Sequence, residues 1–104
     1  MKEPTLSGAS FEPLAGERVR LVGLLEFTTV AALLPLGSAA IHQGRAAVID
    51  LAAVTGSDSA GLALLIEWLS VAKDAGRALR YENVPAQLHQ LARLSDVDSL
   101  ISGA

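Results

Sequence analysis

The segment DSAGL, Asp58–Leu62, places a carboxylate, a hydroxyl and a glycine at the predicted start of a helix. Backbone N–H groups in the first turn of a helix have no acceptor within that helix, and the aligned peptide dipoles make this end attractive to negative charge. The segment is therefore suited to hold a phosphate or a polar group of a partner. Serine and aspartate also cap helices, so Ser57, Asp58 and Ser59 are all candidates for the N-cap.

Catalytic chemistry has little support in this sequence. His42 and His89 lie far apart, and neither has a motif partner for a base–nucleophile pair or a metal site. The chain has no cysteine, which excludes a thiol nucleophile and the usual zinc sites. It also has no glycine-rich loop ending in Lys-Ser or Lys-Thr, so any nucleotide hydrolysis belongs to a partner. We predict a binding module without catalytic residues, metal or cofactor.

Asp50 follows an apolar run and resembles, at first sight, the phosphoacceptor of a response-regulator receiver. A receiver needs a pair of acids near the end of its first strand to hold magnesium, together with a suitably placed lysine. Here Glu26 stands alone, and the only lysines are Lys2 and Lys73. We predict instead that Asp50 accepts hydrogen bonds from its own loop.

Composition limits the class of protein. A chain of 104 residues suits one domain, and a composition that is 51% hydrophobic but only 4% aromatic predicts an aliphatic core. The formal net charge is −3 and the eight basic residues are spread along the chain, so a nucleic-acid partner is not expected. The absence of cysteine favours a reducing cytosol.

The N-terminal part of the sequence predicts a flexible arm followed by two strands. Met1–Ser10 is polar and small, and we predict that it forms a flexible arm in front of a single domain over residues 11–104. Phe11–Ala15 is predicted to be a short edge strand, and Val19–Leu25 is the clearer strand.

The apolar stretch Leu21–Ile41 is long enough to suggest a membrane span, and its only charge is Glu26. Thr28 or Thr29 is however a natural cap for a helix that starts inside the stretch, and Pro35 would interrupt a spanning helix. We therefore predict a strand followed by a helix, with no insertion into the membrane.

The rest of the chain continues to alternate strands and helices. Arg45–Leu51 contains an uncharged run typical of a strand that is covered on both faces. Thr55–Ser57 is predicted to be a loop, and the helix after it runs to about Ala75. Leu79–Glu82 is predicted to form the last strand, and Pro85 to lie in the first turn of a further helix. This order predicts an α/β domain with a mixed central sheet of about four strands.

The helix after Ser59 has a wider apolar surface than one buried face requires. One apolar arc is suited to cover a sheet, and a second stripe beside it contains Leu64, Trp68 and Val71. Two interpretations remain open. Leu64 and Trp68 could pack beneath the C-terminal helix that contains Leu88, or they could form a docking surface, since tryptophan is enriched among binding anchors.

Two segments together resemble the STAS domain, the fold of anti-sigma factor antagonists. They are Val48–Leu51 and Asp58–Leu65, and the resemblance extends over about Val19 to Ile101. In antagonists of this family, the serine that matches Ser59 is the phosphoacceptor for a partner kinase. The resemblance therefore implies that Ser59 is a possible phosphorylation site.

Within the family, the chain is most similar to the small STAS subunit of the Mla system, a bacterial ABC transporter that moves phospholipids between the inner and outer membranes. The similarity lies in Leu33–Leu36, Gly61–Leu65 and Val84–Leu94. It implies that the domain binds the cytoplasmic ATPase through the hydroxyl loop and the following helix. That subunit has threonine where this chain has Ser59, which leaves phosphorylation open.

These observations give one prediction and one alternative. We predict a non-catalytic, cytoplasmic subunit, peripheral to the inner membrane, that binds an ABC ATPase and, through it, the membrane permease. The alternative is an anti-sigma factor antagonist regulated at Ser59. Ser59 would present its hydroxyl, Gly61 would let the partner backbone come close, and the apolar side chains would supply buried area. The predicted partner-binding residues are Asp58, Ser59, Ala60, Gly61, Leu64, Trp68 and Val71.

Overall fold

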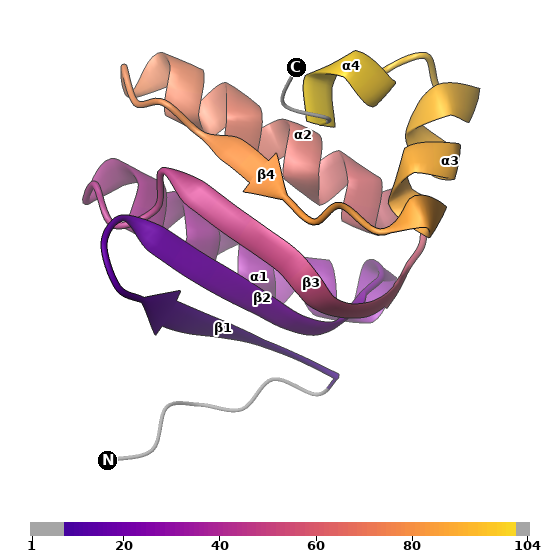
Figure 1. Cartoon of the computed structure of the whole chain (residues 1–104), viewed down its shortest axis with the longest axis horizontal. Coiled ribbons are helices and arrows are strands. Elements are labelled where there is room, and N and C mark those ends of the chain that lie inside the picture. The colour runs from indigo at the N-terminus through magenta and orange to yellow at the C-terminus, as the bar shows by residue number, and fades with distance from the viewer. Residues whose placement is uncertain (1–7, 102–104) are drawn as a thin grey trace.

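The computed structural model describes residues 8–101, which form a four-stranded mixed sheet in the order β1-β2-β3-β4 (Figure 1). Strand β1 (Ala9–Leu14) runs antiparallel to β2 (Arg18–Leu25), while β3 (Val48–Ser57) and β4 (Arg80–Glu82) continue the sheet in parallel. The predicted α/β class with a mixed sheet of about four strands is confirmed.

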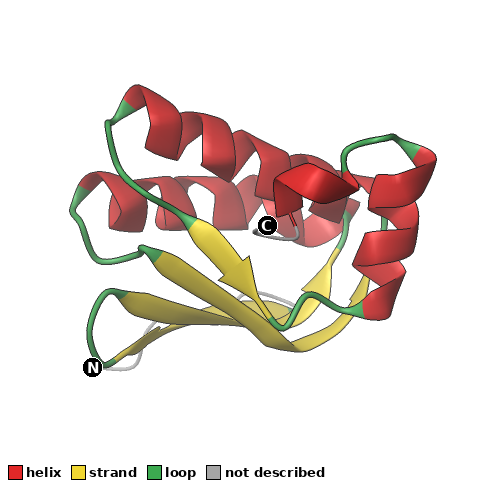
Figure 2. Ribbon diagram, turned by 45° about the horizontal axis from the view of Figure 1, so that its top comes forward, coloured by secondary structure: helices red, strands yellow, loops and turns green. Residues whose placement is uncertain are grey.

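The helices lie on one side of the sheet, as Figure 2 shows. They are α1 (Phe27–His42), α2 (Ser59–Asp74), α3 (Ala86–Leu94) and the short α4 (Asp98–Ile101). Helices α1 and α2 lie side by side and bury their apolar stripes against the inner face of the sheet. The expectation that the third strand is covered on both faces is wrong for most of β3, because no helix of residues 8–101 covers the other face, where Asp50 is half-buried and Ala52 is exposed; only Val48, at the start of the strand, is buried there.

The core lies between this helical layer and the inner face of the sheet. Its side chains are mostly aliphatic, as the composition predicts, with one tryptophan at the centre. The largest side chains that are fully buried include Leu21, Leu25, Leu33, Ile49, Leu65, Trp68 and Leu88.

The first strand begins earlier than expected. Ala9 and Ser10 pair with Gly23 and Val22 of β2, so they belong to the sheet and not to the predicted arm. Gly23 has φ +102°, and an added Cβ would lie 2.1 Å from the carbonyl oxygen of Gly8, so glycine is required for this close approach. The remainder of the predicted arm, residues 1–7, lies outside the described part of the chain.

Strand β3 is longer than expected, and Thr55–Ser57 belongs to it instead of forming a loop. Its register against β2 shifts twice, between the partners of Arg20 and Val22 and again between those of Gly23 and Leu24. Such bulges place extra residues on one strand and increase its twist. The tertiary pairing keeps the chain extended through residues whose composition is typical of a turn.

Helix α1 begins at Phe27, with Glu26 as its N-cap, and not at the threonines. Thr29 lies in the first turn, where its Oγ1 accepts a hydrogen bond from the Glu26 N–H (3.1 Å) and donates one to the Leu24 carbonyl oxygen (2.8 Å). The apolar stretch is thus divided between β2 and α1. Within residues 8–101, no helix is both long and apolar enough to cross a bilayer.

The ends of the long helices agree with the glycine signals in the sequence. Gly44 and Gly76 follow α1 and α2 with φ values of +72° and +67°. In each case a backbone N–H two residues past the cap returns to the last turn, from Arg45 to Ala40 and from Arg77 to Ala72. Pro85 is the N-cap of α3, one residue before its first turn, and α4 was not predicted.

Candidate partner-binding site

Asp58 joins the N-termini of two helices. Its Oδ1 accepts hydrogen bonds from the N–H groups of Ala60 (2.9 Å) and Gly61 (3.2 Å) in the first turn of α2. Its Oδ2 accepts from the N–H of Phe27 (3.2 Å), the first residue of α1. A carboxylate in this place satisfies orphan donors and favours both helix dipoles. Asp58 therefore supports the site structurally and fixes how the two helices start side by side.

Ser59 is exposed at the first position of α2. Because Asp58 is the N-cap, the Ser59 hydroxyl is not used for capping. Ser57 is not the cap either, since its Oγ donates to the carbonyl oxygen of Asp58 (3.1 Å). Among residues 8–101 the Ser59 hydroxyl has no hydrogen-bond partner. It is therefore available to another molecule, for binding or for modification.

Gly61 has an internal role, which corrects the prediction that it lets a partner come close. The residue is buried, and an added Cβ would lie 2.2 Å from Ser57 Oγ and 2.6 Å from the carbonyl oxygen of Leu25. Glycine at this position allows the start of α2 to rest directly on the end of β2. The loop that presents Ser59 is thereby held rigidly against the sheet.

Trp68 and Leu64 belong to the core, with 0% and 4% of their surface exposed. The Trp68 Nε1–H donates to the carbonyl oxygen of Leu34 in α1 (3.1 Å), and its ring centroid lies 5.8 Å from that of Phe11. At Gly37 an added Cβ would lie 2.2 Å from Trp68 Cε2, so this glycine makes room for the indole. The prediction that Trp68 contacts a partner is wrong. Leu34 and Gly37 lie on α1 and Phe11 lies on β1, whereas the core interpretation expected the C-terminal helix.

An apolar groove lies between the N-terminal halves of α1 and α2, and its volume is about 290 Å³. The floor includes Leu64, so this buried residue still contributes to the site. Val71 lies further along α2 and is partly buried against the core. The groove is lined by Val30, Ala31, Leu34, Ala60, Ala63, Leu64 and Glu67.

Phe27 is a surface residue that the sequence pattern did not single out. It begins α1 with 79% of its surface exposed. Its spacing to Val30, Ala31 and Leu34 is i, i+3, i+4 and i+7, which places all four on one side of the helix. This stripe was visible in the sequence, but it merges with the stripe that faces the sheet. The candidate binding surface is therefore formed by two helices, and not by α2 alone.

Helix α3 also supports the end of β3, two residues before Ser59. The Gln87 Oε1 accepts a hydrogen bond from the Ser57 N–H (3.0 Å). The last residue of β3 is thus held from α3, as well as by its neighbours in the sheet.

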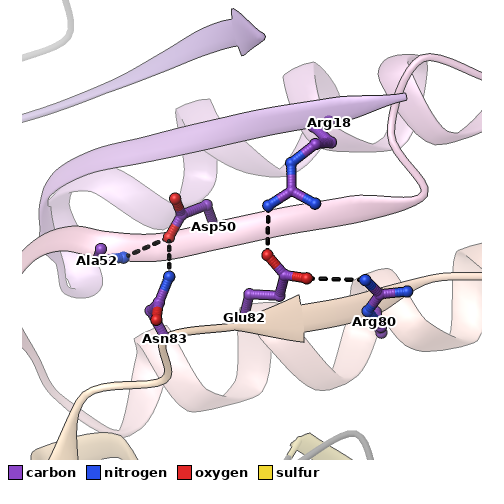
Figure 3. A network of polar contacts seen from close by, with 6 residues as sticks. All are labelled: Arg18, Asp50, Ala52, Arg80, Glu82 and Asn83. Atoms are coloured by element: carbon purple, nitrogen blue, oxygen red, sulfur yellow. Dashed lines mark hydrogen bonds and ion pairs between the residues drawn. The ribbon is translucent and has the colours of Figure 1, made fainter. Parts of the chain in front are cut away.

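The outer face of the sheet carries a separate polar network, shown in Figure 3. Asp50 Oδ1 accepts from Asn83 Nδ2 (3.0 Å) and from the Ala52 N–H (2.9 Å) at the first bulge. These bonds, that of Asn83 first, lower the pKa of Asp50. The prediction that Asp50 accepts hydrogen bonds from its own loop is wrong in one respect: its two donors are Ala52 within β3 and Asn83 after β4.

Glu82 connects two arginines in the same network. Its carboxylate accepts hydrogen bonds from Arg18 of β2 and from Arg80 Nη2 (2.8 Å), and the bond from Arg18 is the main reason that the pKa of Glu82 is lowered. At the other edge, Arg20 Nη1 lies 3.8 Å from Glu12 Oε1. The charges on this face are therefore compensated within the sheet.

The part of the chain that the structure describes contains no candidate metal site. No group of three or more His, Asp or Glu side chains there is placed to hold a metal ion. His42 is exposed in the last turn of α1, and His89 is half-buried in α3.

Comparisons with known structures agree on the fold. The anti-sigma factor antagonist SpoIIAA in its unphosphorylated form gives a TM-score of 0.67 at 18% identity, with 89% of this chain and 84% of that chain covered. The phosphorylated form of SpoIIAA, a Bacillus cell fate determinant, gives 0.65 at 18% identity, over 89% and 87% of the two chains. The crystal structure of Mglu gives 0.56 at 22% identity, over 78% of this chain but only 20% of that one.

The sequence comparisons are more specific. No curated protein sequence matches this chain. The sequence profile described as "Mlab, STAS domain" matches residues 12–102, which is nearly the whole chain. Together with the fold and the Asp58–Leu62 helix start, this match shows that the chain belongs to the STAS domain family of the Mlab type.

Proposed function

We propose that this STAS domain is a non-catalytic subunit that binds the cytoplasmic ATPase of a Mla-type ABC transporter of phospholipids. In this role it is located in the cytoplasm, peripheral to the inner membrane through the ATPase and the permease. The domain supports the assembly and activity of the ATPase and contributes no chemistry of its own.

The observation that carries this proposal is the exposed hydroxyl of Ser59, which has no hydrogen-bond partner in the described part of the chain, next to Ala60 in the lining of the apolar groove. The hydroxyl is presented by a loop that Asp58, Gly61 and Gln87 hold in place, so little ordering is needed on binding. An exposed aromatic, Phe27, stands at the start of the adjacent helix. A polar group next to apolar area is typical of a protein interface, and the match to the Mlab profile favours the transporter class.

A second candidate is an anti-sigma factor antagonist that is switched by phosphorylation of Ser59. The exposed hydroxyl without a capping role favours it, since a kinase needs access to the acceptor. A phosphate would add up to about two negative charges at the start of α2, favourable to the helix dipole but disruptive in a closely packed interface.

Co-expression with the neighbouring genes, followed by purification through a tag on this chain, separates the two candidates. Recovery of an ABC ATPase in stoichiometric amount is the result expected for the transporter subunit. Recovery of a serine kinase or a sigma regulator without the ATPase would overturn the transporter assignment.

Variants of Ser59 sharpen the test. Ser59→Asp adds a negative charge at the proposed contact and should weaken the complex in either role, while Ser59→Ala controls for loss of the hydroxyl alone. Mass spectrometry of the chain purified from cells then tests whether Ser59 is phosphorylated. If no phosphorylated Ser59 peptide is found under any growth condition, the antagonist role fails.

A further inference from the structure

We infer that the groove between α1 and α2 receives a basic amphipathic helix of the partner protein, with its apolar face in the groove and a Lys or Arg beside Glu67. This inference rests on the proposed function in assuming that the partner is a protein that docks at Ser59. It adds the chemistry and the conformation of the segment that binds.

The lining of the groove favours apolar side chains. Apart from Glu67 it consists of valine, leucine and alanine residues. Its volume is about 290 Å³, and water that enters it meets few polar partners. Displacing this water with apolar side chains is favourable. The small side chains of Ala31, Ala60 and Ala63 leave the space that a partner's larger side chains would fill.

The walls of the groove favour a helical occupant. Both walls are α-helices, whose backbone N–H and C=O groups bond within the helix and offer nothing to an added strand. A partner segment that enters here must satisfy its own backbone groups, because every lining residue belongs to α1 or α2 and none to the edge strands β1 and β4. A helix with apolar residues at i, i+3, i+4 and i+7 does so and fits between two parallel ridges.

The charges around the groove favour a basic partner. Helix α1 has no Lys or Arg, and the only one in α2 is Lys73, in its last turn. Glu67 lies in the lining, and the two N-caps Glu26 and Asp58 are also acids, which compensate the positive ends of the helix dipoles. Glu67 is exposed and has no ion-pair partner among residues 8–101. A cation on the partner would complement this acid and help to fix the register of docking.

The inference is tested with two synthetic peptides of about 14 residues, one with Leu and Lys at amphipathic helical spacing and one with Glu in place of Lys. Binding of each fluorescein-labelled peptide to the purified chain is measured by anisotropy. The Lys peptide should bind, and Glu67→Lys should weaken it about ten-fold. Glu17→Lys, which makes the same change of net charge in the turn between β1 and β2, should leave binding within about two-fold of the native value.

Filling the groove provides an independent test. Ala63→Phe should also weaken the Lys peptide about ten-fold, whereas Ala32→Phe, on the exposed side of α1, should leave it unchanged. Equal losses with Glu67→Lys and Glu17→Lys, or equal binding of the Glu peptide, would overturn the inference, because the attraction would then be non-specific. A dimer of the free chain that Ala63→Phe dissociates in sedimentation velocity would identify a second copy as the occupant, and would equally overturn it.

The outcome can be separated from that of the proposed function. If no ATPase is recovered but the peptide binds with the expected dependence on Glu67 and Ala63, the transporter assignment fails and the groove remains a site for basic helices. If the ATPase is recovered and both Glu67→Lys and Ala63→Phe leave its recovery unchanged, the groove inference fails alone.

Discussion

Two surfaces of the domain are exposed: the outer face of the sheet, and the side of the helical layer where α1 and α2 begin. The first carries paired charges, and the second carries exposed apolar area. On the sheet, Glu12, Arg20, Asp50 and Glu82 occupy partnered positions across the four strands, and each acid there has an Arg or amide partner. On the helical side, Phe27 and an apolar groove are exposed, and Glu67 in the lining of the groove has no ion-pair partner in the described part of the chain.

This difference indicates which surface needs another molecule. A sheet face whose charges are compensated internally is stable in water and discourages stacking of sheets through its ionic side chains. A groove that holds water against apolar side chains gains free energy when it is covered. We therefore expect partners to act on the helical surface, and changes of pH to act on the sheet.

The largest expected effect lies beneath the binding surface. Trp68→Ala should lower the free energy of unfolding by about 3–5 kcal/mol, because it leaves a cavity between α1 and α2. Trp68→Phe, which loses the bond to the Leu34 carbonyl but keeps most of the volume, should cost about 1–2 kcal/mol. Urea unfolding monitored by circular dichroism measures both. If instead partner binding is lost while the free energy of unfolding is unchanged, Trp68 is a docking residue. The distinction between buried residues that stabilise the fold and surface residues that contact the partner would then fail.

The next effect tests the surface itself. Phe27→Ala should weaken binding of the co-purified partner at least ten-fold, as expected for an aromatic anchor of about 1.4 kcal/mol or more. Its free energy of unfolding should change by less than about 0.5 kcal/mol, since the side chain is exposed. Leu94→Ala, at the end of α3, is the matched control because Leu94 is 86% exposed. Calorimetric titration that shows equal losses for both variants would contradict the assignment of the surface.

Adjacent residues in the hydroxyl loop should behave differently. Asp58→Ala should cost about 1–2 kcal/mol of stability, because it removes the cap of α2 and the bond to the first N–H of α1. Ser59→Ala should cost less than about 0.5 kcal/mol, because its hydroxyl caps nothing. Thermal or urea unfolding of the two variants provides the comparison, and a larger cost for Ser59→Ala would show that Ser59 is structural.

The smallest effect concerns pH and the sheet. The folded pKa of Asp50 is lowered, so its contribution to stability is present above the unfolded value of about 3.9 and is lost as the pH falls through the folded value. Asp50→Asn removes the titration while keeping an acceptor oxygen for Ala52 and Asn83. The free energy of unfolding, measured by urea titration at several pH values between about pH 5 and pH 2, should therefore fall less steeply with decreasing pH for Asp50→Asn than for the native chain. If the free energy of unfolding falls equally with pH in both proteins, Asp50 contributes nothing to the pH dependence of stability.

Much of the fold followed from local patterns. Apolar runs predicted β2 and β4, and Pro85 predicted the start of α3, each within a few residues; Gly44 and Gly76 marked two helix ends. The turn-like composition of Thr55–Ser57 was misleading, because pairing with β2 through two bulges keeps that segment extended. Local propensity is weak compared with the hydrogen bonds and burial of a central strand.

The site was predicted less completely than the fold. The sequence identified the loop that presents Ser59, since acceptor side chains before an apolar helical run are a reliable start signal. It did not identify Phe27, nor the second helix of the binding surface. A helical pattern shows which residues share a side of one helix, but not which neighbouring helix covers that side.

The sequence alone determined that this is a small α/β chain with a hydroxyl at the start of a helix and two apolar stripes on that helix. The tertiary structure decided what each stripe does. Gly37 leaves space on α1 for the Trp68 indole, so the stripe with the tryptophan is buried. The alanines nearer the helix starts leave a groove that no other element of residues 8–101 covers. The reason is geometric: periodicity fixes directions around a helix axis, whereas burial depends on the shape of the opposing surface.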